Sequence, residues 1–98
     1  MPVFFLSPAA EEGLLDISAY TLRTWGERQA DRYLSELENC CRKLAANPLM
    51  GRPCDDISSG LRRIEQGSHV IFYRQKSDGI LISRILHRSM LPGRYVMD

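Results

Sequence analysis

The chain has 98 residues, of which 44% are hydrophobic and 26% charged, and its formal net charge is +1. These values are typical of one soluble globular domain over residues 1–98 and argue against a disordered or fibrous protein. No stretch approaches the ~20 apolar residues that a membrane helix needs, and the N-terminus lacks the basic and apolar regions of a signal peptide. We therefore expect a cytoplasmic protein that does not bind a membrane.

The three cysteines form a poor disulfide framework, because their number is odd and Cys40 and Cys41 are adjacent. Reduced thiols are the alternative, and they fit a cytosolic protein. Two neighbours on one helix cannot both face a core, so we expect one thiol of this pair to be exposed. Cys54, His69 and His87 do not complete the paired spacing of a zinc site. We expect neither a metal nor a cofactor.

Charge is unevenly distributed along the chain. Residues 1–60 carry six basic and nine acidic residues, a balance of −3, whereas residues 61–98 carry seven basic and three acidic residues, a balance of +4. Both histidines also lie in the second part. The basic residues are either solvated side chains on strands or a surface that binds an acidic partner.

The first elements are predicted to be a strand and a helix. Val3–Leu6 is a short apolar run of β-forming residues. Ser7 and Pro8 then supply a helix N-cap and a proline at the first helical position, and Gly26 is placed to end the helix. The apolar face of this helix contains Ala10, Leu14, Ile17, Thr21 and Trp25, with Tyr20 at its flank.

A second helix is predicted from Glu27 to Asn47, where Pro48 follows and stops it. Because only a residue or two around Gly26 separates the two helices, they must form an antiparallel hairpin. Residues 49–60 are rich in glycine, proline, aspartate and serine and are predicted to be a loop. The apolar face of the second helix contains Ala30, Tyr33, Leu34, Leu37, Cys40, Cys41 and Leu44.

Three strands follow, at Leu61–Gln66, His69–Arg74 and Ile80–His87, and the Asp78-Gly79 pair marks a hairpin turn between the last two. The order β-α-α-β-β-β predicts an α+β fold, with an antiparallel sheet and the helical hairpin packed on one face. The first strand is expected to join this sheet. The other face stays partly exposed unless the chain after residue 87 folds back over it.

A basic cluster on these strands is the main functional candidate. Pleating sends alternate residues to opposite faces, so we expect three to five of its members to share the uncovered face. Such a patch suits RNA phosphates or an acidic protein segment. RNA cleavage also needs a proton donor and acceptor, for which the nearby candidates are His69, His87, Tyr73 and Tyr95. The cluster consists of Arg62, Arg63, Arg74, Arg84, His87, Arg88 and Arg94.

Four motifs resemble one known family. They are Trp25-Gly26 at the helix junction, L-A-x-N-P-x-x-G-R-P at residues 44–53, G-L-R-R at residues 60–63 and H-V-I-F-Y-R at residues 69–74. Together they cover most of the chain, and it resembles the ParE toxins of the RelE/ParE superfamily. The resemblance implies a RelE/ParE-like fold and the toxin of a bacterial type II toxin–antitoxin system, kept inactive by a cognate antitoxin.

The resemblance also implies candidate functions. ParE-like members inhibit DNA gyrase without being enzymes and cause growth arrest, whereas the RelE branch cleaves mRNA on the ribosome, and fold alone does not choose between them. A toxin that has lost toxicity and only binds its antitoxin is a third possibility. Family antitoxins wrap around the groove of the helical hairpin and the sheet edge. Leu15, Leu22 and Trp25 are candidate contacts for such an antitoxin, with peripheral core as the alternative for each.

The C-terminal run carries most of the information about the branch. ParE-like members commonly end H-x-R-M-D-P-x-R-H, and this chain matches at His87, Met90, Pro92 and Arg94. It departs from that pattern by having Ser89, Leu91 and Tyr95. The chain is also less basic than RNA-binding proteins usually are, so direct nucleic-acid binding is not expected and gyrase inhibition is the leading hypothesis.

Two sets of site residues follow from this comparison. A ribonuclease of the RelE type would use Arg84, Arg88 and Tyr95. The residues predicted to bind the target of a gyrase inhibitor are Arg62, Arg63, Arg74, Arg84, His87, Arg88, Met90, Arg94 and Tyr95.

Overall fold

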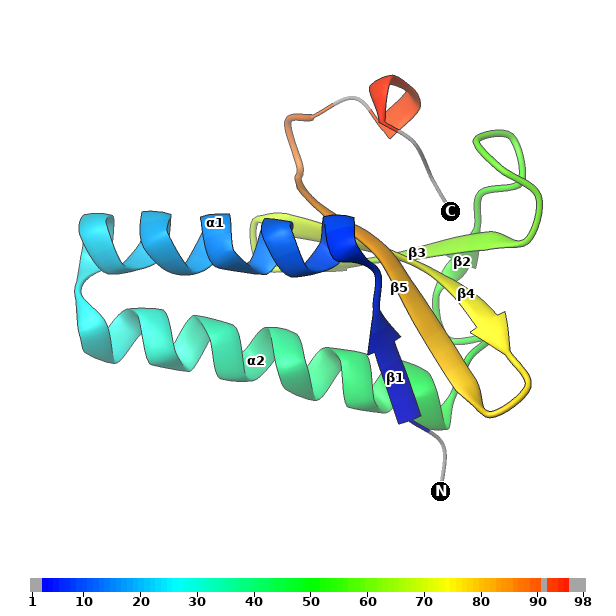
Figure 1. Ribbon diagram of the computed structural model, residues 1–98, viewed down its shortest axis with the longest axis horizontal. Coiled ribbons are helices and arrows are strands. Elements are labelled where there is room, and N and C mark those ends of the chain that lie inside the picture. The colour runs from blue at the N-terminus through cyan, green and yellow to red at the C-terminus, as the bar shows by residue number, and fades with distance from the viewer. Residues whose placement is uncertain (1–2, 91, 96–98) are drawn as a thin grey trace.

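The chain folds into a five-stranded sheet with two long helices on one face (Figure 1). The structure is a computed structural model that describes residues 3–90 and 92–95. In chain order the elements are β1 (Val3–Leu6), α1 (Pro8–Trp25), α2 (Glu27–Ala46), β2 (Arg52–Pro53), β3 (Leu61–Gln66), β4 (His69–Lys76), β5 (Gly79–His87) and the 3-10 helix η1 (Pro92–Arg94). The expected α+β architecture is confirmed. Within these residues, no helix is long and apolar enough to cross a bilayer.

The strand order across the sheet is β1-β5-β4-β3-β2. β1 joins the sheet as expected, but the expectation of a purely antiparallel sheet is wrong for this strand, because β1 runs parallel to β5. The chain leaves β1 through the helical hairpin and re-enters the sheet at its far side. The last strand therefore arrives beside β1 in the same direction.

β2 was not expected inside the loop at residues 49–60. Its two residues pair with Arg63 and Arg62 of β3 and form one edge of the sheet. Proline cannot donate a ladder hydrogen bond, so composition indicates a loop, yet an edge strand tolerates proline on its outer side.

The start of α1 is fixed by Ser7, as the sequence predicts. The Ala10 N–H donates to Ser7 Oγ at 3.0 Å, so Ser7 caps the helix. The same hydroxyl donates to the carbonyl oxygen of Ser83 in β5 at 2.7 Å. One buried side chain therefore ends β1, begins α1 and ties both to the neighbouring strand.

Ser83 is the extra residue of a β-bulge in β5. Phe72 pairs with Arg84 while the next residue, Tyr73, pairs with Ile82, so Ser83 has no partner in the register. Without the bulge, Arg84 would follow Ile82 onto the helix-covered face, since side chains alternate. The bulge instead turns Arg84 to the opposite face of the sheet.

The main core fills the layer between the helices and the sheet. Both adjacent cysteines belong to it, with 7% of Cys40 and 3% of Cys41 exposed, so the expectation that one is exposed is wrong. α2 contacts β1 on one flank and β3 on the other, which buries neighbouring residues on both flanks. Trp25 is not part of the core, because the helical hairpin extends beyond the sheet (Figure 1) and leaves this residue 50% exposed. The buried members are Ala10, Ile17, Leu37, Cys40, Cys41, Leu44, Ala45, Ile71, Tyr73, Ile80, Ile82 and Ile85.

Tyr73 anchors the loop that follows α2. Its fully buried hydroxyl donates to the Pro48 carbonyl oxygen at 2.8 Å and accepts the Gly51 N–H at 2.9 Å. A Cβ atom at position 51 would lie 2.5 Å from this hydroxyl, so the approach requires glycine. Tyr73 is therefore a structural residue and is not placed to transfer protons to a ligand, as the sequence had allowed.

Tyr33 joins the middle of α2 to the turn between β3 and β4. Its hydroxyl lies 2.6 Å from His69 Nδ1 and accepts the Ser68 N–H at 2.9 Å. The His69 ring packs edge-to-face against His87, with centroids 5.4 Å apart. Burial and, to a smaller extent, the neighbouring His87 lower the pKa of His69 below its ordinary value. His69 is thus a hydrogen-bonded histidine at the end of a strand, as the sequence suggests.

We predict that Tyr73→Phe lowers the free energy of unfolding by about 1–3 kcal/mol, because it leaves the buried Gly51 N–H without an acceptor. Urea denaturation of both proteins measures the change. Tyr20→Phe is the matched control, because Tyr20 is 53% exposed and its hydroxyl should contribute little. Equal losses in the two variants would contradict the role assigned to Tyr73.

The second prediction concerns pH. An unfolded His69 takes up a proton near pH 6.5, whereas the folded chain resists protonation until a lower pH, so the unfolded state binds more protons in between. Stability should therefore fall as the pH drops below about 6.5. His69→Gln should flatten this part of the profile, as measured by urea midpoints at pH 7.5, 6.5 and 5.5. Profiles of the same slope in both proteins would rule out this origin.

Candidate functional site

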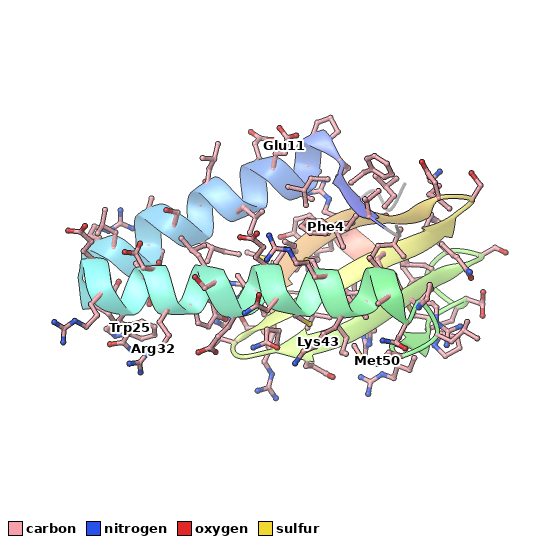
Figure 2. The ribbon with its side chains drawn as sticks, turned by 90° about the horizontal axis from the view of Figure 1, so that it is seen from below. Phe4, Glu11, Trp25, Arg32, Lys43 and Met50 are labelled. Carbon is pink, nitrogen blue, oxygen red and sulfur yellow. The ribbon has the colours of Figure 1, made fainter. Side chains whose placement is uncertain are left out.

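An apolar groove opens between the two helices beside β1, and we call it the hairpin groove. Its volume is about 500 Å³, which is within the usual range of ligand pockets. Figure 2 shows Phe4 between α2 and the first turns of α1, where Glu11 is labelled. Glu11 and Glu38 are the two acidic residues of the lining. The lining residues are Phe4, Leu6, Glu11, Leu14, Leu15, Ser18, Leu34, Leu37, Glu38 and Cys41.

The three predicted antitoxin contacts are only partly brought together. Leu15 lines the hairpin groove and is 70% exposed. Leu22 lies two helical turns further along the same side of α1 and is 52% exposed. Trp25 lies at the tip of the hairpin, where its ring contacts Tyr20 at a centroid distance of 6.4 Å. The sequence missed Phe4 and Leu6 of the groove, which the alternation of residues along β1 could have indicated.

The outer edge of β1 is a second feature of this side. The Val3 N–H points to the Asp78 carbonyl oxygen at 3.4 Å, and the Ser7 N–H donates to that of Ile82 at 3.0 Å. Consecutive residues of a strand direct their N–H groups to opposite sides, so Phe4 and Leu6 direct theirs away from β5. β1 is the end of the strand order, so among the described residues this edge is open to a further strand.

The sheet face opposite the helices, which we call the open face, carries a small apolar cluster and several arginines, three of which belong to the predicted basic cluster. The register places Arg63, Arg74 and Arg84 on it, in agreement with the expected three to five. Arg62 points to the other face, where its guanidinium donates to the carbonyl oxygens of Gly51 and Leu49. The apolar cluster consists of Cys54, Leu61, Phe72 and Leu86, with Ile57, Val70 and Tyr95 packed against it.

Two of the predicted arginines, Arg74 and Arg84, hold chain segments on the open face. The Arg74 guanidinium donates to Ser58 Oγ and to the Ser59 carbonyl oxygen, and so it ties down the loop before β3. The Arg84 guanidinium lies 5.2 Å from the centroid of the Tyr95 ring, a cation–π contact. The chain after β5 therefore folds back over the open face. The sequence alone did not decide whether it would.

The other described residues of the C-terminal run are mostly exposed. Met90 is 44% exposed, and Arg88 and Arg94 are exposed. The His87 side chain turns away from Arg84, since its Nδ1 atom lies 2.8 Å from Ser89 Oγ and its ring packs on His69. Of the predicted ribonuclease set, Arg84 and Tyr95 are in contact, and Arg88 follows β5 nearby. Leu91, the third departure from the family pattern, lies outside the described residues.

Metal ligands are not clustered in residues 3–90 and 92–95, where no group of three histidine, cysteine or acidic side chains is placed to hold an ion. Cys54 lies at the start of the loop between β2 and β3, and its thiol is free and buried in the apolar cluster of the open face. Burial raises the pKa of its thiol, and the positive charge of Arg63 opposes that shift. This thiol is therefore mostly protonated at neutral pH and is a weak nucleophile.

Comparison with known proteins identifies the family. Residues 4–92 match the family model described as the ParE toxin of the type II toxin–antitoxin system parDE. Toxin ParE1 of Mycobacterium tuberculosis is 43% identical over 88 residues, which are 89% of this chain and 90% of that protein. Toxin ParE1 of Caulobacter vibrioides is 40% identical over 90 residues, which are 92% and 93% of the two chains.

A solved structure supports the fold. The chain superposes with a TM-score of 0.73 on a structure described as the chromosomal ParDE toxin–antitoxin system from P. aeruginosa, over 89% of this chain and 96% of that one, at 23% sequence identity. This likeness shows a shared fold, and the family match and the curated relatives carry the assignment. The chain belongs to the ParE family of toxins of type II toxin–antitoxin systems.

Proposed function

We propose that this ParE-family toxin acts as a non-enzymatic inhibitor of DNA gyrase and is neutralised by a cognate antitoxin. Family membership supports the antitoxin. The observation that carries the proposal is that the hairpin groove and the open face are two different surfaces on opposite sides of the sheet. One protein can therefore bind an antitoxin on one side and a target on the other. Gyrase acts on the chromosome, so the proposed site of action is the cytoplasm.

The hairpin groove and the outer edge of β1 suit an antitoxin segment. The groove is apolar, as the apolar face of an amphipathic helix requires, and the edge offers the N–H groups of Phe4 and Leu6 to an added strand. Glu11 borders the groove, and Glu38 on the opposite helix forms an ion pair with Arg42. We expect basic residues on the antitoxin near Glu11, where the acid has no such ion pair among the described residues.

The open face and the C-terminal run suit the target. Arginine and tyrosine are frequent anchors of protein interfaces, and here Arg84 and Tyr95 hold each other in place beside the exposed Met90. His87 points to His69 and Ser89, so its imidazole is not beside the Arg84–Tyr95 pair. This arrangement favours binding over proton transfer at the open face.

The antitoxin surface is tested by Leu15→Asp. A carboxylate in the apolar groove should weaken antitoxin binding at least tenfold, or about 1.4 kcal/mol, as measured by calorimetry, and cells should then arrest despite the antitoxin. Leu49→Asp is the matched control, because Leu49 is 69% exposed against 70% for Leu15 but lies outside the groove. Equal weakening by both variants, or by neither, would refute the assignment of the groove.

The target is tested on purified toxin. The protein freed from its antitoxin should block gyrase supercoiling or trap cleaved DNA and should leave RNA intact. Arg84→Gln should raise the concentration for half-inhibition at least fivefold, whereas Arg28→Gln, an exposed position on α2, should not.

Two results would remove gyrase as the target. One is unaffected gyrase at a large molar excess of toxin. The other is codon-specific mRNA cleavage in expressing cells that is lost in Tyr95→Phe, which would establish the ribonuclease instead. Normal growth when the chain is expressed alone would indicate a toxin that only binds its antitoxin.

A further inference from the structure

A small hollow lies on the open face at the end of β5, and we call it the terminal hollow. Its volume is about 230 Å³, below the usual range for drug-sized ligands, so it has room for one side chain. Phe72, 1% exposed, and Leu86, 5% exposed, supply an apolar floor. Arg63, Arg88 and Met90 belong to its wall.

Two guanidinium groups of this wall are available to a ligand. Arg63 and Arg88 make no side-chain hydrogen bond or ion pair with the described part of the chain, unlike Arg74 and Arg84. Their backbones are fixed nevertheless. Arg63 stands opposite Phe72 in the register, and the Arg88 N–H donates to the Ser68 carbonyl oxygen at 2.9 Å.

The one carboxylate of the wall does not neutralise these cations. Glu65 forms an ion pair with Arg52 of the edge strand at 3.0 Å, and its charge is directed there. The terminal hollow therefore combines an apolar floor with two positive charges that have no ion-pair partner in residues 3–90 and 92–95. A ligand that fits must bring a negative charge and a short hydrocarbon part.

A glutamate side chain has this composition. Its carboxylate accepts hydrogen bonds from guanidinium groups in a fixed planar geometry, and its two methylene groups match an apolar floor. A nucleic-acid phosphodiester has oxygens on every side of its phosphorus, and those directed at Phe72 and Leu86 would meet no donors there. The floor thus favours an acidic side chain over a nucleic-acid backbone.

We propose that the terminal hollow seats a glutamate side chain of the toxin's protein target, with the carboxylate between Arg63 and Arg88 and the methylene groups on Phe72 and Leu86. The proposal deepens the proposed function and rests on the target being a protein. It adds the chemistry of one contact, which is the same whichever target subunit supplies it.

The test uses the full-length chain and a capped glutamate, N-acetylglutamate N-methylamide, with the corresponding glutamine compound as the neutral control. Titration is followed by NMR on the side-chain Nε–H signals of the arginines. The capped glutamate should shift the Arg63 and Arg88 signals saturably, with a dissociation constant on the order of millimolar for so small a ligand. The glutamine compound should not.

Variants locate the binding. Arg63→Gln and Arg88→Gln should each weaken the capped glutamate at least fivefold, whereas Arg28→Gln on α2 should leave it unchanged, and an unchanged backbone amide spectrum shows that each variant is folded. Equal binding of the glutamine compound, absence of saturable shifts, or tighter binding of inorganic phosphate or of a single-stranded RNA oligonucleotide would each overturn the proposal.

A gyrase inhibition assay distinguishes failure of the glutamate contact from failure of gyrase as the target. If wild type inhibits gyrase and the Arg63→Gln/Arg88→Gln double variant inhibits it equally well, the terminal hollow is not the contact, while gyrase stands as the target. If the capped glutamate binds as expected and gyrase is unaffected by wild type, the hollow stands and gyrase fails.

Discussion

The arrangement of both surfaces depends on the hydroxyl of Ser7. It accepts the Ala10 N–H and donates to the carbonyl oxygen of Ser83, so the start of α1 and the bulge of β5 are fixed by the same atom. Capping by serine is worth about 1 kcal/mol in helix stability. Its larger effect here is geometric, because a bulge sets which side chains of the following strand face the helices.

The bulge determines which side chains of β5 face the helices and which face the open side of the sheet. Ile80, Ile82 and Ile85 enter the main core, while Arg84 and Leu86 reach the open face. Phe72 then lies between Arg63 and Arg84 in the register, and Tyr95 returns onto Arg84. The hairpin groove forms on the other side from β1 and the helices. Two surfaces of different chemistry therefore share one thin sheet.

The elements that the sequence predicted are those with local signals. Ser7-Pro8, Gly26 and Asn47-Pro48 act on their immediate neighbours, and the helix ends agree with them. The bulge could not be predicted, since the carbonyl of Ser83 is held by a hydroxyl 76 residues away.

The roles of individual site residues depended on long-range contacts of the same kind. Tyr73 was a candidate for proton transfer on its residue type alone, and the Pro48 carbonyl and Gly51 N–H make it structural. Arg62 and Arg63 are neighbours of the same type, and only strand register assigns one to the loop after α2 and the other to the open face.

The three cysteines allow the two sides of the sheet to be observed separately. All are free and buried, and burial raises the pKa of each thiol, to about 12 for Cys41. A thiol reagent therefore reacts only when the structure around the thiol opens locally. For Cys40 and Cys41 this requires local opening of α2, and for Cys54 it requires opening of the loop between β2 and β3. The rates of labelling at these positions would show whether a partner that binds one side of the sheet also reduces local opening on the other side.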